Sequence, residues 1–291
     1  MDVGAAFFGE KQLYQPLLDK GVGKLTSFEP DAKEFNKLKD LANRGSEDVV
    51  LNCALGDGDT HTLHLAPGGM TSFLEPDQDS YNLYSLFSNP PFSPVQTSFR
   101  KQDMSTTRLD DIGEIDQIDF LKVDVQGSEL MILQNGRQKL ADCSIVQIEV
   151  PFVSLYKNQP TFGDIDNELH SQGFMVHGFA NIKRLPIHPY TKYGTLSGIN
   201  QLVDLDMIYI RDIKKMDSLS AIVLKKIAVA AEICFYSFDL ALRCLSELSG
   251  RGVVSKRTPE RYISSRSTGR HRIACLHYTP AYNPPTGRIP S

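Results

Sequence analysis

The sequence predicts an α/β fold with a mostly parallel sheet, and three observations support that prediction. Short apolar runs alternate with amphipathic segments through the first 211 residues, and alternating strand and helix patterns are typical of parallel sheets. Acidic residues directly follow several of the runs, at the edge of such a sheet where ligands bind. A composition of 41% hydrophobic and 23% charged residues over 291 residues is ordinary for a globular protein with a sizeable core.

Six apolar runs have the length and composition of strands. The run over 118–125 is the clearest candidate for a buried strand. In chain order the six runs cover residues 24–28, 49–55, 118–125, 144–150, 174–179 and 204–212.

Three amphipathic segments between these runs predict helices. Apolar residues recur at helical spacing in each, and Gly45 and Gly173 can end the first and the third. The three segments cover residues 29–45, 127–140 and 161–172.

Residues 60–105 are rich in Pro, Ser, Gly and Asn, which predicts hairpins and loops and no helix. Within them, the loop 68–94 is either a lid over a site or an irregular surface insertion, and both interpretations stand. The polar and aromatic residues on which the lid interpretation depends are Thr71, Ser72, Tyr81, Tyr84 and Phe87.

The chain divides into three parts. Residues 1–212 form the α/β domain, and 213–250 form a helical segment with one long helix from about 219 to 248. That helix is apolar on more than one face, so we expect it to pack on the main domain or on another subunit. Residues 251–291 hold eight Lys or Arg against one acid and show no periodicity, which predicts a disordered tail.

The bulk properties exclude several classes of protein. A net charge of −4 is mild and argues neither for nor against nucleic acid as a partner. The basic tail could touch RNA or an anionic surface, but we favour its interpretation as a solvated appendage and expect no nucleic acid partner. Charged residues interrupt the most apolar stretch, 219–248, so we expect no membrane span. Five scattered cysteines without metal-ligand spacing predict inert, mostly buried thiols in a cytoplasmic protein. The pair His61 and His64 lacks acids placed as ligands, so we expect it to be solvated and predict no metal.

The first candidate site lies at the start of the chain, in the sequence MDVGAAFFGE. Asp2 precedes Gly4, and Gly9 follows before a helical segment that begins near Lys11. Glycines let a backbone approach a ligand closely. The sequence has no compact GxGxxG motif, and an acid at this turn would repel a pyrophosphate. A cationic cofactor without phosphate suits the turn better, and S-adenosylmethionine is such a cofactor.

Three further acids follow later strands in the same order as the strands. Glu29 lies 20 residues after Gly9, the spacing at which an acid can accept both ribose hydroxyls of a cofactor. Asp57 follows the next strand, where adenine would lie, and Asp124 ends the strand that faces the reacting group. Glu29 has a plainer interpretation as a helix first-turn acid favoured by the dipole.

Several segments resemble the FkbM-type S-adenosylmethionine-dependent methyltransferases. DVGA with Gly9 resembles the first cofactor motif of that family, and FEPDAKEFNKL (28–38) resembles its second strand and acid. LDDIGEIDQIDFLKVDVQGSELMILQNG (109–136) resembles its most distinctive block, and IVQIEVPFVSLY (145–156) follows as expected. The likeness runs from residue 2 to about 212.

The resemblance implies a class I methyltransferase (Rossmann-like) fold, with seven strands and helices on both faces, that O-methylates a hydroxyl. It implies that Asp2, Gly4 and Glu29 bind the cofactor and that Asp124 lies between cofactor and substrate. The chain departs from the family pattern at two places. The loop after Gly4 is one residue longer, and Gln126 stands where the family often has Glu.

Methyl transfer is a displacement at an activated carbon, so the protein has to align the nucleophile and exclude water. A hydroxyl nucleophile also benefits from a general base. The candidate bases are Asp124, Glu129 and Glu149, with Lys122 as a positioning cation. Alternatively, Glu129 is a helix first-turn acid, and Lys122 and Glu149 form a structural pair across adjacent strands.

These observations predict an S-adenosylmethionine-dependent O-methyltransferase that acts on a small metabolite, sugar or glycan. The alternative is a binding module that keeps the fold and has lost catalysis. The sequence leaves the oligomeric state open. A central first strand normally needs about five residues, and only 1–3 can serve here, so we expect the chain to be N-terminally incomplete relative to its relatives.

Overall fold

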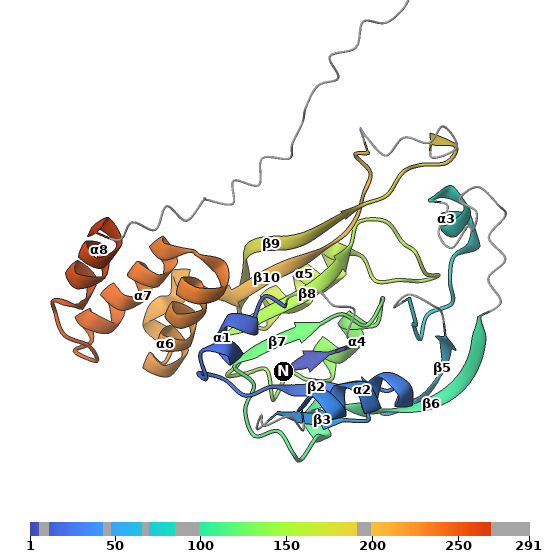
Figure 1. Ribbon diagram of the computed structural model, residues 1–291, viewed down its shortest axis with the longest axis horizontal. Helices are drawn as coiled ribbons and strands as arrows, with labels where there is room; N and C mark the ends of the chain where they lie inside the picture. The colour runs from blue at the N-terminus through green and yellow to red at the C-terminus, as the bar shows by residue number, and fades with distance from the viewer. Residues whose placement is uncertain (6–11, 43–47, 66–69, 85–98, 191–198, 269–291) are drawn as a thin grey trace, which may run out of the picture.

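The core of the molecule is a seven-stranded sheet with helices on both faces (Figure 1). The computed structural model describes residues 1–5, 12–42, 48–65, 70–84, 99–190 and 199–268. The strand order is β3-β2-β1-β7-β8-β10-β9. The first five of these strands run parallel, and β10 is antiparallel to both β8 and β9. The strands are β1 (Asp2–Val3), β2 (Thr26–Phe28), β3 (Val49–Leu51), β7 (Phe120–Val123), β8 (Ile145–Pro151), β9 (Phe174–Arg184) and β10 (Leu202–Arg211). This is the predicted α/β class, and it is consistent with a class I methyltransferase fold.

Strand β1 lies at the point where the strand order reverses. It pairs with β2 on one side and with β7 on the other, with Asp2 opposite both Ser27 and Lys122. A crevice opens beyond the carboxyl ends of strands at such a switch point. The residues that follow β1, β2 and β7 are therefore brought to the same edge of the sheet.

The run over 49–55 forms two strands and not the single strand that the sequence predicts. After β3 the chain turns at Asn52, whose side-chain amide donates to the carbonyl oxygen of Glu29 at 2.8 Å. The next strand, β4 (Ala54–Gly56), joins a separate three-stranded sheet of order β4-β6-β5. The other members are β5 (Thr60–Leu65) and β6 (Arg100–Arg108).

One face of the large sheet carries the main hydrophobic core. Because side chains alternate between the faces of a strand, Leu121 and Val123 on β7 lie on the same face as Ile148 on β8. Helices α4 (Glu129–Gln134) and α5 (Phe162–Ser171) pack their buried apolar residues against this face. The helix α2 (Ala32–Ala42) follows β2, and a 3-10 turn, Leu109–Asp111, adds the buried Leu109 to the core.

The opposite face is apolar at one end and polar at the other. Its apolar end holds Phe120, Ile145 and Ile210 and is covered by α1 (Gln15–Asp19), α6 (Ala221–Ala230) and α7 (Phe238–Gly250). Moving along the same strands toward the carboxyl edge, Phe120 is followed on this face by Lys122, and Ile145 by Gln147. Both polar residues are buried, and Lys122 is among the residues that line the candidate site.

The helical segment after β10 packs on the main domain and is broken, whereas the sequence predicts one helix over 219–248. A 3-10 segment, Ile213–Ser218, leads into α6, and α6 continues into a π-helical turn, Ala231–Phe235. Tyr236 then takes a left-handed conformation with φ of 54°. Left-handed backbone cannot continue an α-helix, so α7 starts anew with a different direction.

Part of the predicted disordered tail is a helix, α8 (Thr258–Thr268), which corrects that prediction. The Tyr262 hydroxyl donates to Glu232 at 2.5 Å. The Arg266 guanidinium carbon lies 3.9 Å from the centre of the Phe238 ring, and the guanidinium also pairs with Glu232. These contacts hold α8 against the helices before it. Residues 269–291 lie outside the described part.

The predicted loop 68–94 contains a short helix, α3 (Gln78–Leu83), where the sequence predicts none. Asp77 caps it by accepting from the backbone N–H groups of Asp79 and Ser80. Tyr81 and Tyr84 are buried in a small third cluster that includes Tyr156. The composition of the loop concealed this helix because Asp, Ser and Asn favour caps as well as loops.

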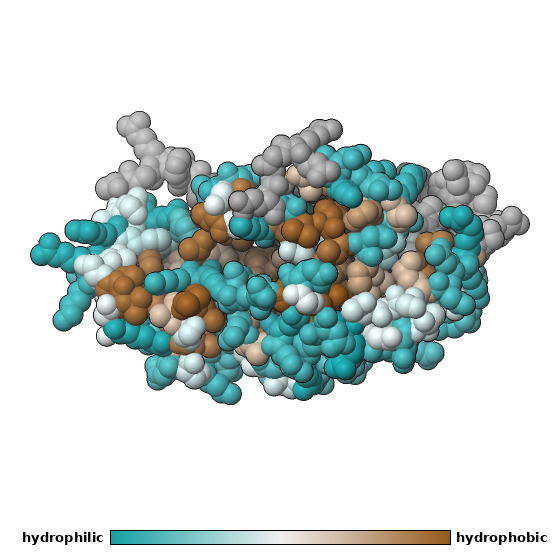
Figure 2. Space-filling model, turned by 90° about the horizontal axis from the view of Figure 1, so that it is seen from below, coloured by the Kyte–Doolittle hydropathy of each residue, from teal (hydrophilic) through white to brown (hydrophobic). Residues whose placement is uncertain are grey.

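The surface is mixed in character. Figure 2 shows one face, on which apolar residues gather in separate patches between hydrophilic ones. Among the residues that the structure describes, no helix has both the length and the apolar character that a transmembrane span needs.

Candidate active site

A cleft of about 1260 Å³ opens at the carboxyl edge of the parallel strands. The ends of β1 and β2 line one side of it, together with residues of β4. The ends of β7 and β8 and the start of β10 line the other side. Met70 to Phe73, from the predicted lid segment, form a further wall, whereas Tyr81 and Tyr84 of that segment lie in the third core cluster. Phe87 lies outside the described residues.

Gly4 brings the end of β1 against the end of β7. Its φ is 80°, a value that L side chains rarely adopt, and a Cβ atom here would lie 1.9 Å from the carbonyl oxygen of Asp124. Both Gly4 and Ala5 donate their backbone N–H to the carbonyl oxygen of Phe28, at 3.2 and 3.3 Å. Only glycine permits this turn, which leaves Gly4 and Asp124 side by side on the wall of the cleft.

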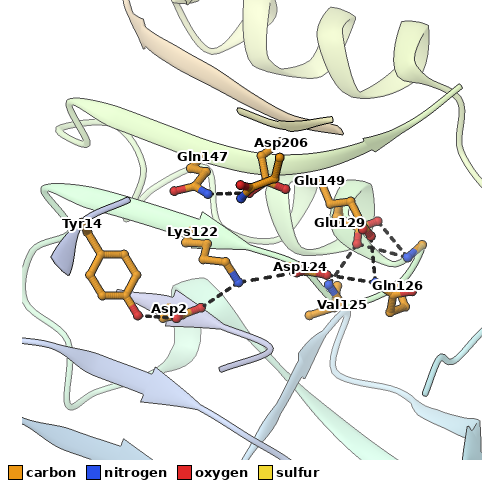
Figure 3. Close-up of polar contacts among 12 residues, drawn as sticks. Asp2, Tyr14, Lys122, Asp124, Val125, Gln126, Glu129, Gln147, Glu149 and Asp206 are labelled. Carbon is orange, nitrogen blue, oxygen red and sulfur yellow. Dashed lines mark hydrogen bonds and ion pairs between the residues drawn. The ribbon is translucent and has the colours of Figure 1, made fainter. Parts of the chain in front are cut away.

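Asp2 and Lys122 form a buried ion pair beneath the cleft (Figure 3). Lys122 Nζ lies 3.4 Å from Asp2 Oδ1 and 3.6 Å from Asp124 Oδ2, and the Tyr14 hydroxyl donates to Asp2 Oδ2 at 2.5 Å. Burial alone would lower the pKa of Lys122, but the nearby carboxylates, Asp2 first, outweigh it and raise that pKa. Lys122 is therefore charged, and it ties the first strand to Asp124.

Asp2 is not among the described residues that line the cleft. Its side chain is 4% exposed and is occupied by Tyr14 and Lys122. The sequence predicts Asp2 as a cofactor ligand, whereas in the structure its carboxylate contacts Lys122 and Tyr14.

Glu29 lies at the predicted position, directly after β2 and on the wall of the cleft. One carboxylate oxygen accepts the backbone N–H of Asp31 at 2.8 Å, which leaves the second oxygen for another partner. Burial raises the pKa of Glu29 to about 7. A donor from a bound molecule that faces this carboxylate would favour its ionised form.

The structure does not bring Asp57 to the cleft. Asp57 follows β4 in the small sheet and pairs with His61 at 2.8 Å, which is the first cause of its lowered pKa. The sequence assigned Asp57 to the cleft because it treated 49–55 as one strand of the large sheet. Gly9, the remaining predicted cofactor contact, lies outside the described residues.

The turn after β7 is organised by Glu129. Its carboxylate, buried at the first position of α4, accepts the backbone N–H of Val125 at 3.0 Å and that of Gly127 at 3.0 and 3.1 Å. Burial raises the pKa of Glu129 to about 7. Because these hydrogen bonds point it into the turn, Glu129 supports the turn and is not among the described residues that line the cleft.

Glu149 faces the cleft beside Asp124. The side-chain amide of Gln126 donates to both acids, at 3.0 Å to Asp124 Oδ1 and 2.9 Å to Glu149 Oε2 (Figure 3). Burial, and next the charge of Asp124, raise the pKa of Glu149 well above its usual value. The alternative pairing of Glu149 with Lys122 is wrong, because Lys122 pairs with Asp2 and Asp124.

A comparison with protein families agrees with this arrangement. The Methyltransferase FkbM domain matches residues 2–176, more than half of the chain. The chain belongs to the FkbM methyltransferase family. Proteins of this family use S-adenosylmethionine. Comparison with curated proteins and with solved structures finds no match.

The cleft of this FkbM domain suits a cationic cofactor. S-adenosylmethionine carries a sulfonium and an ammonium group, and the described acids on the wall outnumber the bases by seven to four. Gly4 lines this cleft, and the close approach that its missing side chain permits is to the backbone of Asp124. The acids are Glu29, Asp31, Glu34, Asp124, Glu149, Asp204 and Asp206, and the bases are Lys33, Arg100, Lys122 and Lys183.

The sequence analysis missed the part of the wall that comes from β9 and β10. Asp206 Oδ2 accepts from Gln147 at 2.5 Å and from Asn181 at 2.9 Å, and Asp204 pairs with Lys183 at 3.0 Å. The signal was the alternation DLD at the start of the last strand, which places both acids on one face. It points to the cleft only if that strand is known to be antiparallel, since its start then lies at the carboxyl edge.

The histidines of the FkbM domain are placed differently from the prediction. His64 is 6% exposed, so it is buried and not solvated, and burial lowers its pKa. His61 is bonded to Asp57. Among the residues described by the structure, no group of three or more His, Cys, Asp or Glu is arranged to hold a metal ion.

Proposed function

We propose that this FkbM domain transfers a methyl group from S-adenosylmethionine to a hydroxyl of a small metabolite, sugar or glycan. The observation that supports a hydroxylated acceptor is the wall formed by Glu149, Asp204 and Asp206 beside Asp124. Carboxylates accept hydrogen bonds, and an acceptor rich in hydroxyl groups can donate to several of them at once.

The cofactor half of the cleft extends from the end of β1 to β4. Gly4 lets the backbone approach the cofactor, and Glu29 accepts the ribose hydroxyls with the oxygen that Asp31 leaves open. Ala54 and Leu55 provide an apolar wall beyond Glu29, where a base can pack. Asp2 contributes indirectly by holding Lys122 in place.

The acceptor half extends from Asp124 to β10. Bound S-adenosylmethionine supplies a methyl group on a sulfonium, which is already activated for displacement. Asp124, whose side chain is one-third exposed, orients the acceptor hydroxyl, with Lys122 fixing its position from below. Glu149 takes the hydroxyl proton. Burial raises the pKa of Glu149, and a carboxylate with a raised pKa takes up a proton more readily than one with an ordinary pKa.

Charge balance links the two halves. A bound cation next to Glu149 favours its ionised form, since an opposite charge within about 4–6 Å lowers a carboxyl pKa. Cofactor binding therefore prepares the base. We place the reaction in the cytoplasm, because the four described cysteines are free thiols, three of them buried.

The first test is calorimetry with S-adenosylhomocysteine. Heat of binding with the intact protein is expected, and no heat at ligand concentrations of about a millimolar would contradict cofactor use by this chain. The second test uses S-adenosylmethionine labelled on its methyl group with separate pools of monosaccharides, glycans and hydroxylated metabolites. Label in one pool, lost in Glu149→Gln, supports the enzyme. Binding without label in any pool would favour the catalytically inactive module.

A further inference from the structure

Gln126 is the residue that connects the two acids of the acceptor half. It follows Asp124 by two positions and has a φ of 58°, a left-handed value that is uncommon for residues other than glycine. This conformation turns its side chain back over β7 and β8. One amide nitrogen, Nε2, then reaches both Asp124 Oδ1 and Glu149 Oε2.

The orientation of the amide is determined by its neighbours. Tyr156 places its hydroxyl 3.1 Å from Gln126 Oε1, and a carbonyl oxygen can accept that proton. Carboxyl oxygens accept hydrogen bonds, and the NH₂ end of the amide faces those of Asp124 and Glu149. Each polar atom of the side chain thus has a partner of the matching kind.

The backbone of Gln126 is held as well. Its carbonyl oxygen accepts the Ser72 hydroxyl at 2.6 Å, and the Tyr156 hydroxyl also lies 3.3 Å from the Met70 carbonyl oxygen. Met70 and Ser72 belong to the wall opposite β10. Gln126 therefore joins the acid pair to that wall.

An acid at position 126 would repel the two carboxylates that the amide of Gln126 holds together. Glu in place of Gln126 would bring a third carboxylate to Asp124 and Glu149 and remove both N–H donors. Carboxylates that share a site cannot all ionise readily, and one of them holds its proton to a higher pH. The amide avoids this conflict.

We propose that Gln126 is a positioning residue, whose amide holds the carboxylates of Asp124 and Glu149 together and ready to act as one unit on the acceptor hydroxyl. The assignment of Glu149 as base rests on the proposed function. The hydrogen bonds of Gln126 and their effect on ionisation do not, so the two can be tested apart.

The experiment is a pH titration of the Glu149 side-chain carboxyl, followed by ¹³C NMR of intact protein labelled at glutamate Cδ, with the signal assigned from Glu149→Gln. The charged groups that face Glu149 are Asp124 from the end of β7, Asp204 from β10, Glu129 from α4 and Lys183 from β9. All remain in Gln126→Glu and Gln126→Met. We expect both variants to raise the midpoint of Glu149 by about one pH unit or more.

Gln78→Glu is the matched control, because it makes the same chemical change on exposed α3. Tyr156→Phe tests the idea with a smaller change: the amide loses the hydroxyl that orients it, and the midpoint should rise by less than in Gln126→Met. If the Gln126 variants do not fold, the midpoint of Glu149 in Tyr156→Phe tests the proposal alone. A midpoint that stays at the wild-type value in every folded variant overturns the proposal.

Calorimetry with S-adenosylhomocysteine on the same samples separates the two proposals. A shifted midpoint without binding would leave the role of Gln126 intact and contradict the proposed function. Binding with an unshifted midpoint would support cofactor use by this chain and overturn the proposed role of Gln126.

Discussion

Gly4 and the carbonyl oxygen of Asp124 are so close that no side chain fits between them. A Cβ atom on residue 4 would lie 1.9 Å from that oxygen, and the φ of 80° would strain any L residue. The two residues end adjacent parallel strands, so this contact sets how close β1 and β7 come at the edge of the cleft.

Gly4→Ala should therefore destabilise the fold and the cofactor half of the cleft together. Left-handed strain costs about 1–2 kcal/mol and overpacking about 1–3 kcal/mol, so we expect a loss of about 2–5 kcal/mol. Thermal melting and denaturant titration measure it. Gly113→Ala is the control, because nothing lies within 4 Å of a Cβ atom there. Equal stability of the two variants would contradict the close contact.

Glu29→Gln should make the ligand-free protein more stable at pH 8. Burial raises the pKa of Glu29 from 4.5 to about 7, so folding favours the protonated form. Its contribution to stability is fully present below about pH 4.5 and is lost as the pH rises through about 7. Glutamine mimics the protonated form, so the gain at pH 8 should be about 1–3 kcal/mol and should vanish at about pH 4, below the unfolded pKa. Melting curves at both pH values, with Glu114→Gln as an exposed control, would show it.

The same variant should bind S-adenosylhomocysteine more weakly. If Glu29 accepts the ribose hydroxyls, loss of the charge should cost about 1.5–3 kcal/mol of binding free energy. Calorimetry gives this number directly. Greater stability with unchanged affinity would leave Glu29 as a buried acid without a role toward the cofactor.

Glu129 and Glu149 should respond differently to the same substitution. Glu129→Gln keeps an oxygen that can accept from Val125 and Gly127, so methyl transfer should remain within about tenfold of wild type. Glu149→Gln removes the proposed base and should lower kcat by about 100-fold or more. Glu129→Ala, in contrast, should unfold the turn and cost about 2–4 kcal/mol, since it leaves two buried N–H groups unpaired. A larger loss of kcat in Glu129→Gln than in Glu149→Gln would contradict Glu149 as the base and favour Glu129.

Replacement of Arg211, a buried cation outside the cleft, should strongly destabilise the fold. Its guanidinium donates to backbone carbonyls of Leu140, Ala141, Cys143 and Gln172 and stacks on the Phe174 ring. Lysine cannot supply this fork of donors, so Arg211→Lys should cost about 2–4 kcal/mol. Arg137→Lys is the control, because the Arg137 side chain is 54% exposed and a lysine can still pair with Glu168, so we expect a loss of about 0–1 kcal/mol. Denaturant melts of the two variants would test the difference.

The sequence predicted a mostly parallel α/β sheet and five residues that line the cleft: Lys122 and Glu149 within strands, and Gly4, Glu29 and Asp124 directly after strands. These are local signals, since an acid or a glycine directly after an apolar run falls at the carboxyl edge of a parallel sheet whatever the rest of the chain does. The same rule failed at Asp57, because the turn at Asn52 sends the chain into a second sheet, and no periodicity marks that turn.

Other features depend on contacts between distant segments. The buried partnership of Asp2 with Lys122 requires that strands 120 residues apart lie side by side. The acids of β10 can be assigned to the cleft only when the direction of that strand is known. The break at Tyr236 lies within an apolar stretch of even composition, and tertiary packing overrides the helical pattern there. Residues with these roles cannot be identified from spacing alone.

The antiparallel hairpin of β9 and β10 has a consequence for how this enzyme family can diversify. Asn181, Lys183, Asp204 and Asp206 all come from this one continuous stretch at the rim of the sheet, beyond residue 176, where the family match ends. The strands that carry Gly4 and Glu29 precede it entirely. If these four side chains contact the acceptor, as proposed, exchange of this one hairpin between family members is expected to change the acceptor and to leave Gly4 and Glu29 in place.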